Sequence, residues 1–229
     1  MNWGNEPKNV ISDFLRTHLS DVRSSRGEAN KTETFSGTGS SQIITLTPST
    51  GKKARCIVSV TASSVLKSKW IDYVIDMQNG TITGTFASGT NNVSVVYKEA
   101  SNGWIFPALP EITLSTTKYP CMSLLLVSSQ GDQTGNYLSE IAQSEHFQLD
   151  IWVKEKYYYD DGTNVWSQDA LAMYFARQVV KTFEDNINDL YPKLFNFGLL
   201  NIRDAVWEKD REVYHVIVEF TLDGVSIGG

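Results

Sequence analysis

The three histidines are the first residues to test for chemistry, because histidine is the side chain most often used as a base or metal ligand near neutral pH. They are His18, His146 and His215. Folding can gather three distant histidines into a catalytic zinc site. Their long separations do not predict such a site, however. His18 falls on the apolar stripe of a helical pattern and His215 within a strand pattern, so hydrogen-bonded structural histidines are the favoured interpretation.

The two cysteines give no sign of redox or metal chemistry. Cys56 and Cys121 lie far apart and share no short spacing with each other or with a histidine, so neither a metal knuckle nor a redox pair is indicated. Each falls in an apolar, strand-like run, which predicts a buried thiol. This pattern fits a reducing compartment.

The carboxylates offer two further candidates. Asp72 and Asp76 fall on one face of a predicted strand and could act as an acid–base pair or bind a cation, but charges on a solvated outer face are the favoured interpretation. Asp160-Asp161-Gly162 resembles part of a calcium loop and lacks its later ligands and terminal Glu. Serine-nucleophile, phosphate-loop, dinucleotide and zinc-protease motifs are missing from the sequence. The sequence therefore predicts no catalytic residue, no cofactor site and no metal site, and a protein that is not an enzyme.

Aromatic residues remain as candidates for binding. Trp152 and Trp166 flank the run Tyr157-Tyr158-Tyr159, and such rings stack on sugars or bases. Tyrosine is also enriched in the cores of protein interfaces. The net charge is −6, and a general grip on nucleic acid needs clustered Lys and Arg. Protein contact is therefore the favoured interpretation.

The elements that carry these residues begin with a helix. Pro7 suits its first turn, with Asn5 or Glu6 before it as a cap. Its apolar stripe repeats every three to four residues and comprises Val10, Ile11, Phe14, Leu15, Leu19 and Val22. The helix should end before Ser24, and the polar stretch that follows, to Phe35, should be a connection.

The composition then changes to one rich in Thr, Ser, Gly and β-branched residues, which predicts a β module. The expected strands are Gln42–Thr47, Ala54–Thr61, Trp70–Met77, Thr81–Phe86 and Val93–Lys98. Asn79-Gly80 predicts a type I′ hairpin, because both residue types tolerate positive φ. The last three strands should then form a meander, and all five a small sandwich or barrel.

The rest of the chain predicts strands around one long helix. The expected strands are Ile112–Ser115, Met122–Val127, Phe147–Val153, Leu199–Glu208 and Val213–Leu222. Ser167 should cap the helix, which should stop at Tyr191-Pro192. The polar segments Ser128–Ser144 and Tyr157–Asn164 are interpreted as long loops suited to contacts.

The first helix has too little sequence beside it to bury its stripe alone. We therefore predict an α+β domain made of residues 1–31 and 100–229, with an antiparallel or mixed sheet and two main helices. Residues 32–99 would form an inserted all-β sandwich or barrel domain.

The order of these elements resembles the tail terminator and neck proteins of tailed viruses. The residues that carry the resemblance are Tyr119-Pro120-Cys121-Met122-Ser123-Leu124, Phe147-Gln148-Leu149-Asp150-Ile151-Trp152-Val153, and Arg203 and Trp207 before His215-Val216-Ile217-Val218. The middle of the chain also looks like small β modules of virion proteins, through Asp72-Tyr73-Val74-Ile75-Asp76, Asn79-Gly80-Thr81-Ile82, Ser88-Gly89-Thr90 and Val93-Ser94-Val95-Val96-Tyr97. Minimal proteins of this type lack such an insert.

The resemblance implies a structural virion protein of the tail or neck, assembled in the host cytoplasm. It would form a homo-oligomeric ring, usually a hexamer, that caps the tail tube and joins it to the head–tail connector. Its partners would be copies of itself, the tail tube protein and connector proteins, with DNA passing through the channel without specific binding and without a membrane. The alternative is a binding module in which the β insert recognises a carbohydrate or host surface through Trp70, Tyr73 or the tyrosine cluster.

Overall fold

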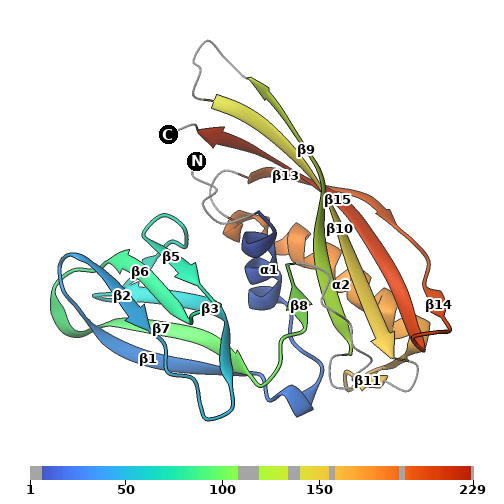
Figure 1. Cartoon of the computed structure of the whole chain (residues 1–229), viewed down its shortest axis with the longest axis horizontal. Coiled ribbons are helices and arrows are strands. Elements are labelled where there is room, and N and C mark those ends of the chain that lie inside the picture. The colour runs from blue at the N-terminus through green and yellow to red at the C-terminus, as the bar shows by residue number, and fades with distance from the viewer. Residues whose placement is uncertain (1–6, 108–118, 134–139, 155–157, 191–193, 228–229) are drawn as a thin grey trace. The chain divides into compact units, whose positions relative to one another are not determined.

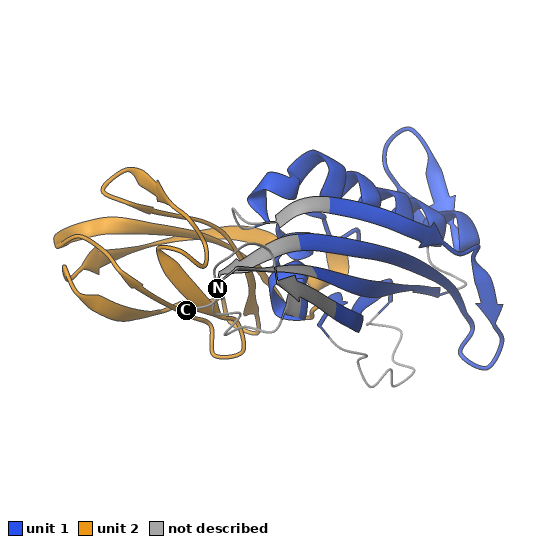
Figure 2. Ribbon diagram, turned by 90° about the horizontal axis from the view of Figure 1, so that it is seen from above, with its two compact units in different colours: residues 1–22, 104–229 blue, residues 23–103 orange. Residues whose placement is uncertain are grey.

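A computed structural model describes residues 7–107, 119–133, 140–154, 158–190 and 194–227. The chain divides into two compact units (Figure 2): unit 1 contains residues 1–22 and 104–229, and unit 2 contains residues 23–103. The sequence placed these divisions at residues 31/32 and 99/100, which differ because residues from Ala29 onward and up to Ala100 belong to paired strands of unit 2.

Unit 1 is built on a sheet in the order β13-β15-β10-β9-β8, with β14 paired to β15 beyond the end of β13. The strands are β8 Ile105–Phe106, β9 Cys121–Gln133, β10 Glu140–Lys154, β13 Leu194–Ile202, β14 Val206–Glu208 and β15 Val213–Ile227. All these pairs are antiparallel except β8 with β9. The predicted α+β class with two main helices is therefore correct. The expected strand Ile112–Ser115 lies outside the described residues.

Helices α1 (Pro7–His18) and α2 (Gln168–Asn186) pack together on one face of this sheet (Figure 1). Phe183 of α2 is central to the packing. Its ring lies 5.2 Å from that of Phe14 in α1, 4.9 Å from Phe220 in β15 and 4.7 Å from Phe197 in β13. Burial of each such side chain contributes roughly 1.5–3 kcal/mol. Because Phe14 packs on Phe183, α1 buries its apolar stripe within unit 1.

Both helices differ from the prediction at their ends. α1 begins at Pro7 as expected but ends at His18, before Val22. Ser167 occupies the N-cap position of α2, yet its hydroxyl makes no capping hydrogen bond. α2 ends at Asn186, and a 3₁₀ turn, η3 (Ile187–Asp189), carries the chain on to the buried Leu190.

The predicted loop Ser128–Ser144 was wrong. β9 and β10 pair through most of this segment, with Glu145 opposite Ser129 and Ile141 opposite Gln133. Polar residues carry a strand pattern poorly, but the ladder satisfies their backbone groups regardless of side chain. The expected strand Leu199–Glu208 likewise proves to be two, β13 and β14, which pair with successive parts of β15.

Unit 2 consists of two sheets around one core. One sheet has the order β1-β7-β3-β4 and the other β2-β6-β5. The strands are β1 Ala29–Gly37, β2 Ser41–Thr45, β3 Lys53–Ala62, β4 Val65–Lys67, β5 Tyr73–Asp76, β6 Thr81–Thr85 and β7 Gly89–Ala100. The shared core draws on both sheets, including Ile44, Ile57, Ile82, Phe86, Val95 and Tyr97.

Two predictions for unit 2 were wrong. The segment before Phe35 is strand β1, not a connection, and β7 pairs with β1 and β3, so the meander does not form. The hairpin β5–β6 does exist, but residues 77–80 connect Asp76 to Thr81. Gly80 has φ 64°, but Asn79 does not have a positive φ. Asn79 instead donates hydrogen bonds of 3.1 and 2.7 Å to the Asp76 carboxylate. Such a longer loop does not require positive φ at both residues.

Candidate functional site

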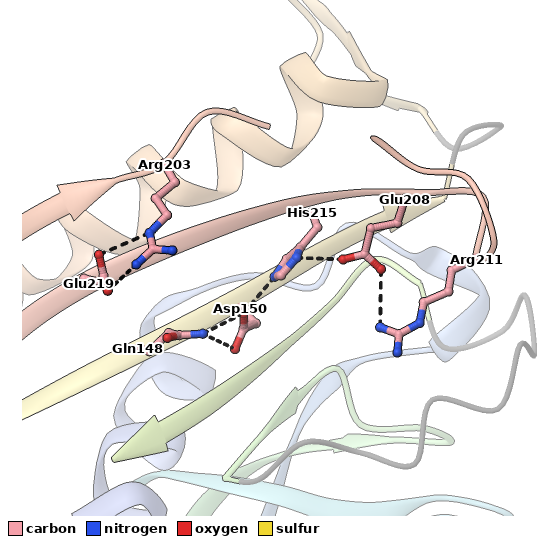
Figure 3. A network of polar contacts seen from close by, with 7 residues as sticks. All are labelled: Gln148, Asp150, Arg203, Glu208, Arg211, His215 and Glu219. Carbon is pink, nitrogen blue, oxygen red and sulfur yellow. Dashed lines mark hydrogen bonds and ion pairs between the residues drawn. The ribbon is translucent and has the colours of Figure 1, made fainter. Parts of the chain in front are cut away.

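The sheet face of unit 1 that lies opposite the helices carries a network of polar side chains (Figure 3). Side chains alternate along a strand, so Phe147 and Leu149 of β10 face the helices while Gln148 and Asp150 face the other way. His215 lies on this same polar face of β15.

His215 is the centre of the network. Its Nε2 lies 2.7 Å from Asp150 Oδ1, and its Nδ1 lies 2.8 Å from Glu208 Oε1. Asp150 also accepts two hydrogen bonds from Gln148 Nε2, each 3.1 Å long, and only 4% of its side chain is exposed. A carboxylate only accepts hydrogen bonds, so both contacts are satisfied together when the imidazole is protonated on both nitrogens.

The network joins three strands and a turn. Glu208 of β14 accepts a hydrogen bond of 3.3 Å from Arg211 Nη1, and Lys154 of β10 donates to the Arg211 carbonyl oxygen at 2.9 Å. His215 therefore ties the short edge strand β14 to β10, with β15 between them (Figure 3). What the arrangement does is fix the β14–β15 hairpin in place.

The same residues are poorly placed for nucleophilic catalysis. Ser123 is buried on this face, opposite Asp150 on the neighbouring strand β9. It is two strands from His215, which corresponds to about 10 Å, whereas a nucleophile must lie within hydrogen-bond reach of its base. Trp152 stacks on His215, with ring centroids 5.2 Å apart, and covers that side of the imidazole.

The three histidines are held in separate places. His18 Nε2 lies 3.4 Å from Asp189 Oδ2 in η3. His146 is opposite Thr221 and His215 is opposite Trp152, so about 20 Å of strand separates them. Among the described residues, no group of three or more His, Cys, Asp and Glu side chains is placed to hold a metal ion.

The remaining chemical candidates have local, structural contacts. Cys56 and Cys121 are buried thiols, as predicted. Asp72 accepts a hydrogen bond of 2.8 Å from the Ser68 backbone N–H, and Asp76 binds Asn79. Hydrogen bonds from Asn79 lower the pKa of Asp76. These two carboxylates stabilise separate turns.

The predicted contact loop Tyr157–Asn164 is largely a hairpin of β11 (Tyr158–Asp160) and β12 (Val165–Ser167), and Tyr157 lies outside the described residues. Tyr159 and Trp166 are opposite each other and pack on Tyr174 of α2, with centroids 6.0 and 5.0 Å away. Trp152 belongs instead to a core cluster with Tyr119, Cys121 and Val213. The structure thus separates Trp152 from the other aromatics.

The edge strands of unit 1 carry exposed apolar side chains that the sequence reading missed. Val206 is 61% exposed, Leu200 54% and Val127 52%. Leu199 and Trp207 are also exposed. Leu200 and Val127 occupy positions where the pairing register shifts. A break in the apolar–polar alternation of the sequence could have indicated these residues. Only the strand pairing, however, shows which strands lie at an edge of the sheet.

The two residues proposed for carbohydrate recognition in unit 2 both contact its core. Tyr73 is 3% exposed and Trp70 is only partly buried but packs against the same core. Large exposed apolar residues of unit 2 are aliphatic: Ile43, Val65, Leu66, Ile71 and Val74. Aliphatic side chains lack the ring faces on which sugars stack.

Comparison with protein-family models and with curated proteins gives no match to this sequence. In the part of the chain that is described, no helix is long and apolar enough to cross a bilayer. The basis for a function is therefore the geometry of the chain itself.

Proposed function

We propose that this chain is a structural subunit that forms a head-to-tail ring, and that the ring ends the tail tube of a tailed virus and joins it to the head connector. The position in the virion is inferred from the resemblance of the sequence to tail terminator and neck proteins. The physical support comes from the sheet of unit 1, in which β13 and most of β9 are edge strands among the described residues.

The direction of the strands carries this proposal. β13 is antiparallel to β15, β15 to β10, and β10 to β9, so β13 and β9 run in opposite directions. Copies related by rotation about an axis along the strands would place β13 of one beside β9 of the next, again antiparallel. Neighbouring strands then remain antiparallel from one copy to the next.

Such a contact is heterologous, because one subunit contributes β13 and the other β9, and a heterologous contact that closes makes a ring. β8 pairs only with the first residues of β9, Met122 and Ser123, and among the described residues no strand pairs with the outer side of β9 beyond them. The exposed Leu200 on one side and Val127 on the other would be covered in the ring. Bulges in both edge strands restrict pairing to a matching partner.

Cross-linking tests the contact directly. Val127→Cys and Leu200→Cys introduce thiols on the two edges, while Cys56 and Cys121 are buried. With a flexible bismaleimide, the double variant should give a ladder of covalent oligomers that stops at one closed size, and each single variant should give nothing beyond a dimer. Light scattering and negative-stain imaging would then show rings.

Ile43→Lys is the matched control for Leu200→Lys, because Ile43 is 70% exposed but lies in unit 2. We expect Leu200→Lys, made without the added cysteines, to abolish the rings seen by light scattering and negative-stain imaging, and Ile43→Lys to leave them unchanged. Dimers that never extend would indicate a two-fold contact and would contradict the proposal.

A further inference from the structure

The β11–β12 hairpin of unit 1 has one face that points away from α2 and carries exposed side chains. Cross-strand pairing places Tyr158 opposite Ser167 and Asp160 opposite Val165. These residues lie on the side away from Tyr159 and Trp166, which pack on α2. Tyr158 and Val165 are each 67% exposed. An aromatic ring, an aliphatic side chain and a carboxylate therefore share one small exposed face.

Within the hairpin and the first turns of α2, the charged residues are all acidic. Between Tyr158 and Ala176 the sequence contains three carboxylates, Asp160, Asp161 and Asp169, and no Lys, Arg or His. Asp161 accepts hydrogen bonds from Trp166 Nε1 at 2.9 Å and from the backbone N–H of Thr163 and Asn164. These bonds, chiefly that from Trp166, lower the pKa of Asp161 and keep it ionised.

The hairpin is also held firmly enough to present this face. Tyr159 and Trp166 both contact the ring of Tyr174, and Tyr174 in turn contacts the buried Phe175 at 5.7 Å. In the turn, Asp160 Oδ1 accepts a hydrogen bond of 2.8 Å from the Gly162 N–H. A rigid aromatic anchor limits the entropy lost on binding.

We propose that this face binds an arginine- or lysine-bearing segment of a neighbouring protein. Such side chains match it in two parts: their apolar stems cover Val165 and the edge of Tyr158, and their cationic heads reach the Tyr158 ring and the Asp160 carboxylate. Arginine fits best, because its planar guanidinium stacks on rings and pairs with carboxylates. A sugar is less favoured, since Tyr158 is the one ring on this outward face of the described hairpin.

This inference rests on the proposed function for the partner's place in the particle, but the binding itself does not require ring closure. The test uses the full-length protein and three fluorescein-labelled peptides of equal length, in which alanine alternates with arginine, citrulline or glutamate. Fluorescence anisotropy should detect binding of the arginine peptide, with the uncharged citrulline peptide at least tenfold weaker and the glutamate peptide inactive.

Variants localise the binding. Asp160→Lys should weaken the arginine peptide at least fivefold and Tyr158→Ser at least threefold, whereas Asp210→Lys, at an exposed acid in the β14–β15 turn, should change affinity less than twofold. Both hairpin substitutions are at exposed positions, and circular dichroism checks that the fold is retained. Equal losses at Asp160 and Asp210, equal binding of the citrulline peptide, no binding of any peptide, or specific binding to a glycan array instead would each overturn the proposal.

The two proposals can fail separately. Peptide binding without a cross-linked ladder between Val127→Cys and Leu200→Cys would leave the hairpin inference intact and contradict the ring. A ladder without peptide binding would do the reverse.

Discussion

In unit 2, Glu33 and Glu99 accept hydrogen bonds from the backbone of one loop, whereas in unit 1 Asp150 and Glu208 accept them from the ring of one histidine. Thr47 N donates to Glu33 and Ser49 N to Glu99, at 3.1 and 2.8 Å. Backbone donors stay in place when a side chain is changed. The unit 1 network instead centres on one side chain, His215, so the two units should respond differently to substitution.

The largest effect is expected for His215→Leu. It removes the imidazole that lies 2.7 Å from the buried Asp150 carboxylate, and leaving a buried charge without its partner costs about 3–5 kcal/mol. Chemical denaturation measures the loss. The double variant His215→Leu, Asp150→Leu should recover much of it, because no buried charge remains, and additive losses would contradict the proposed pairing.

A smaller loss is expected for Glu99→Gln in unit 2. Glu99 accepts from Ser49 N and Ser49 Oγ, both at 2.8 Å, and lies 3.4 Å from Lys52 Nζ. The amide keeps one acceptor oxygen, so the cost should be about 1–2 kcal/mol. Denaturation of this variant beside His215→Leu sharpens the comparison, and an equal loss in both would remove the distinction drawn between the units.

Whether a segment buries one face decided what the sequence could predict. The apolar stripe that includes Phe14 and Leu15 identified α1, and a similar stripe identified α2. The apolar–polar alternation of Phe147–Val153 identified β10. In each case a buried face imposes its period on the sequence. Segments whose backbone is satisfied by pairing alone carry no such period. Both β1 and the ends of β9 and β10 were therefore predicted as connections or loops.

The sequence was a weaker guide to the candidate sites. A structural, hydrogen-bonded His215 was expected, but its partners Asp150 and Glu208 depend on strand register, which local patterns do not fix. The Asn79-Gly80 prediction failed because Asp76 holds Asn79. A two-residue turn with positive φ at both positions occurs instead at Ser63-Ser64, with φ 51° and 64°, between the paired Ala62 and Val65.

Acid should move the two units in opposite directions. In unit 2, hydrogen bonds led by that from Ser49 lower the pKa of Glu99, and those from Tyr97 and Thr47 outweigh burial to lower the pKa of Glu33. Their stabilisation is present above the ordinary value of 4.5 and is lost as pH falls towards the lowered pKa.

In unit 1, burial raises the pKa of Glu145. The ionised form therefore destabilises the fold at neutral pH, and this penalty disappears as pH falls through the raised pKa. Glu145→Gln should stabilise unit 1 at pH 7 and lose that advantage near pH 4. Stability curves of this variant and of Glu99→Gln against pH test both signs, and parallel curves would contradict them.

The smallest effect is expected for Arg203→Ala, which removes an ion pair from the same polar face as His215. Arg203 donates to both Glu219 oxygens, at 2.8 and 3.3 Å, but 53% of its side chain is exposed. Water already solvates such a guanidinium, and exposed pairs contribute less than about 1 kcal/mol. The loss should also vanish in 1 M salt, because screening removes it, while that of His215→Leu persists. If salt rescued both variants, burial of Asp150 would not be what separates them.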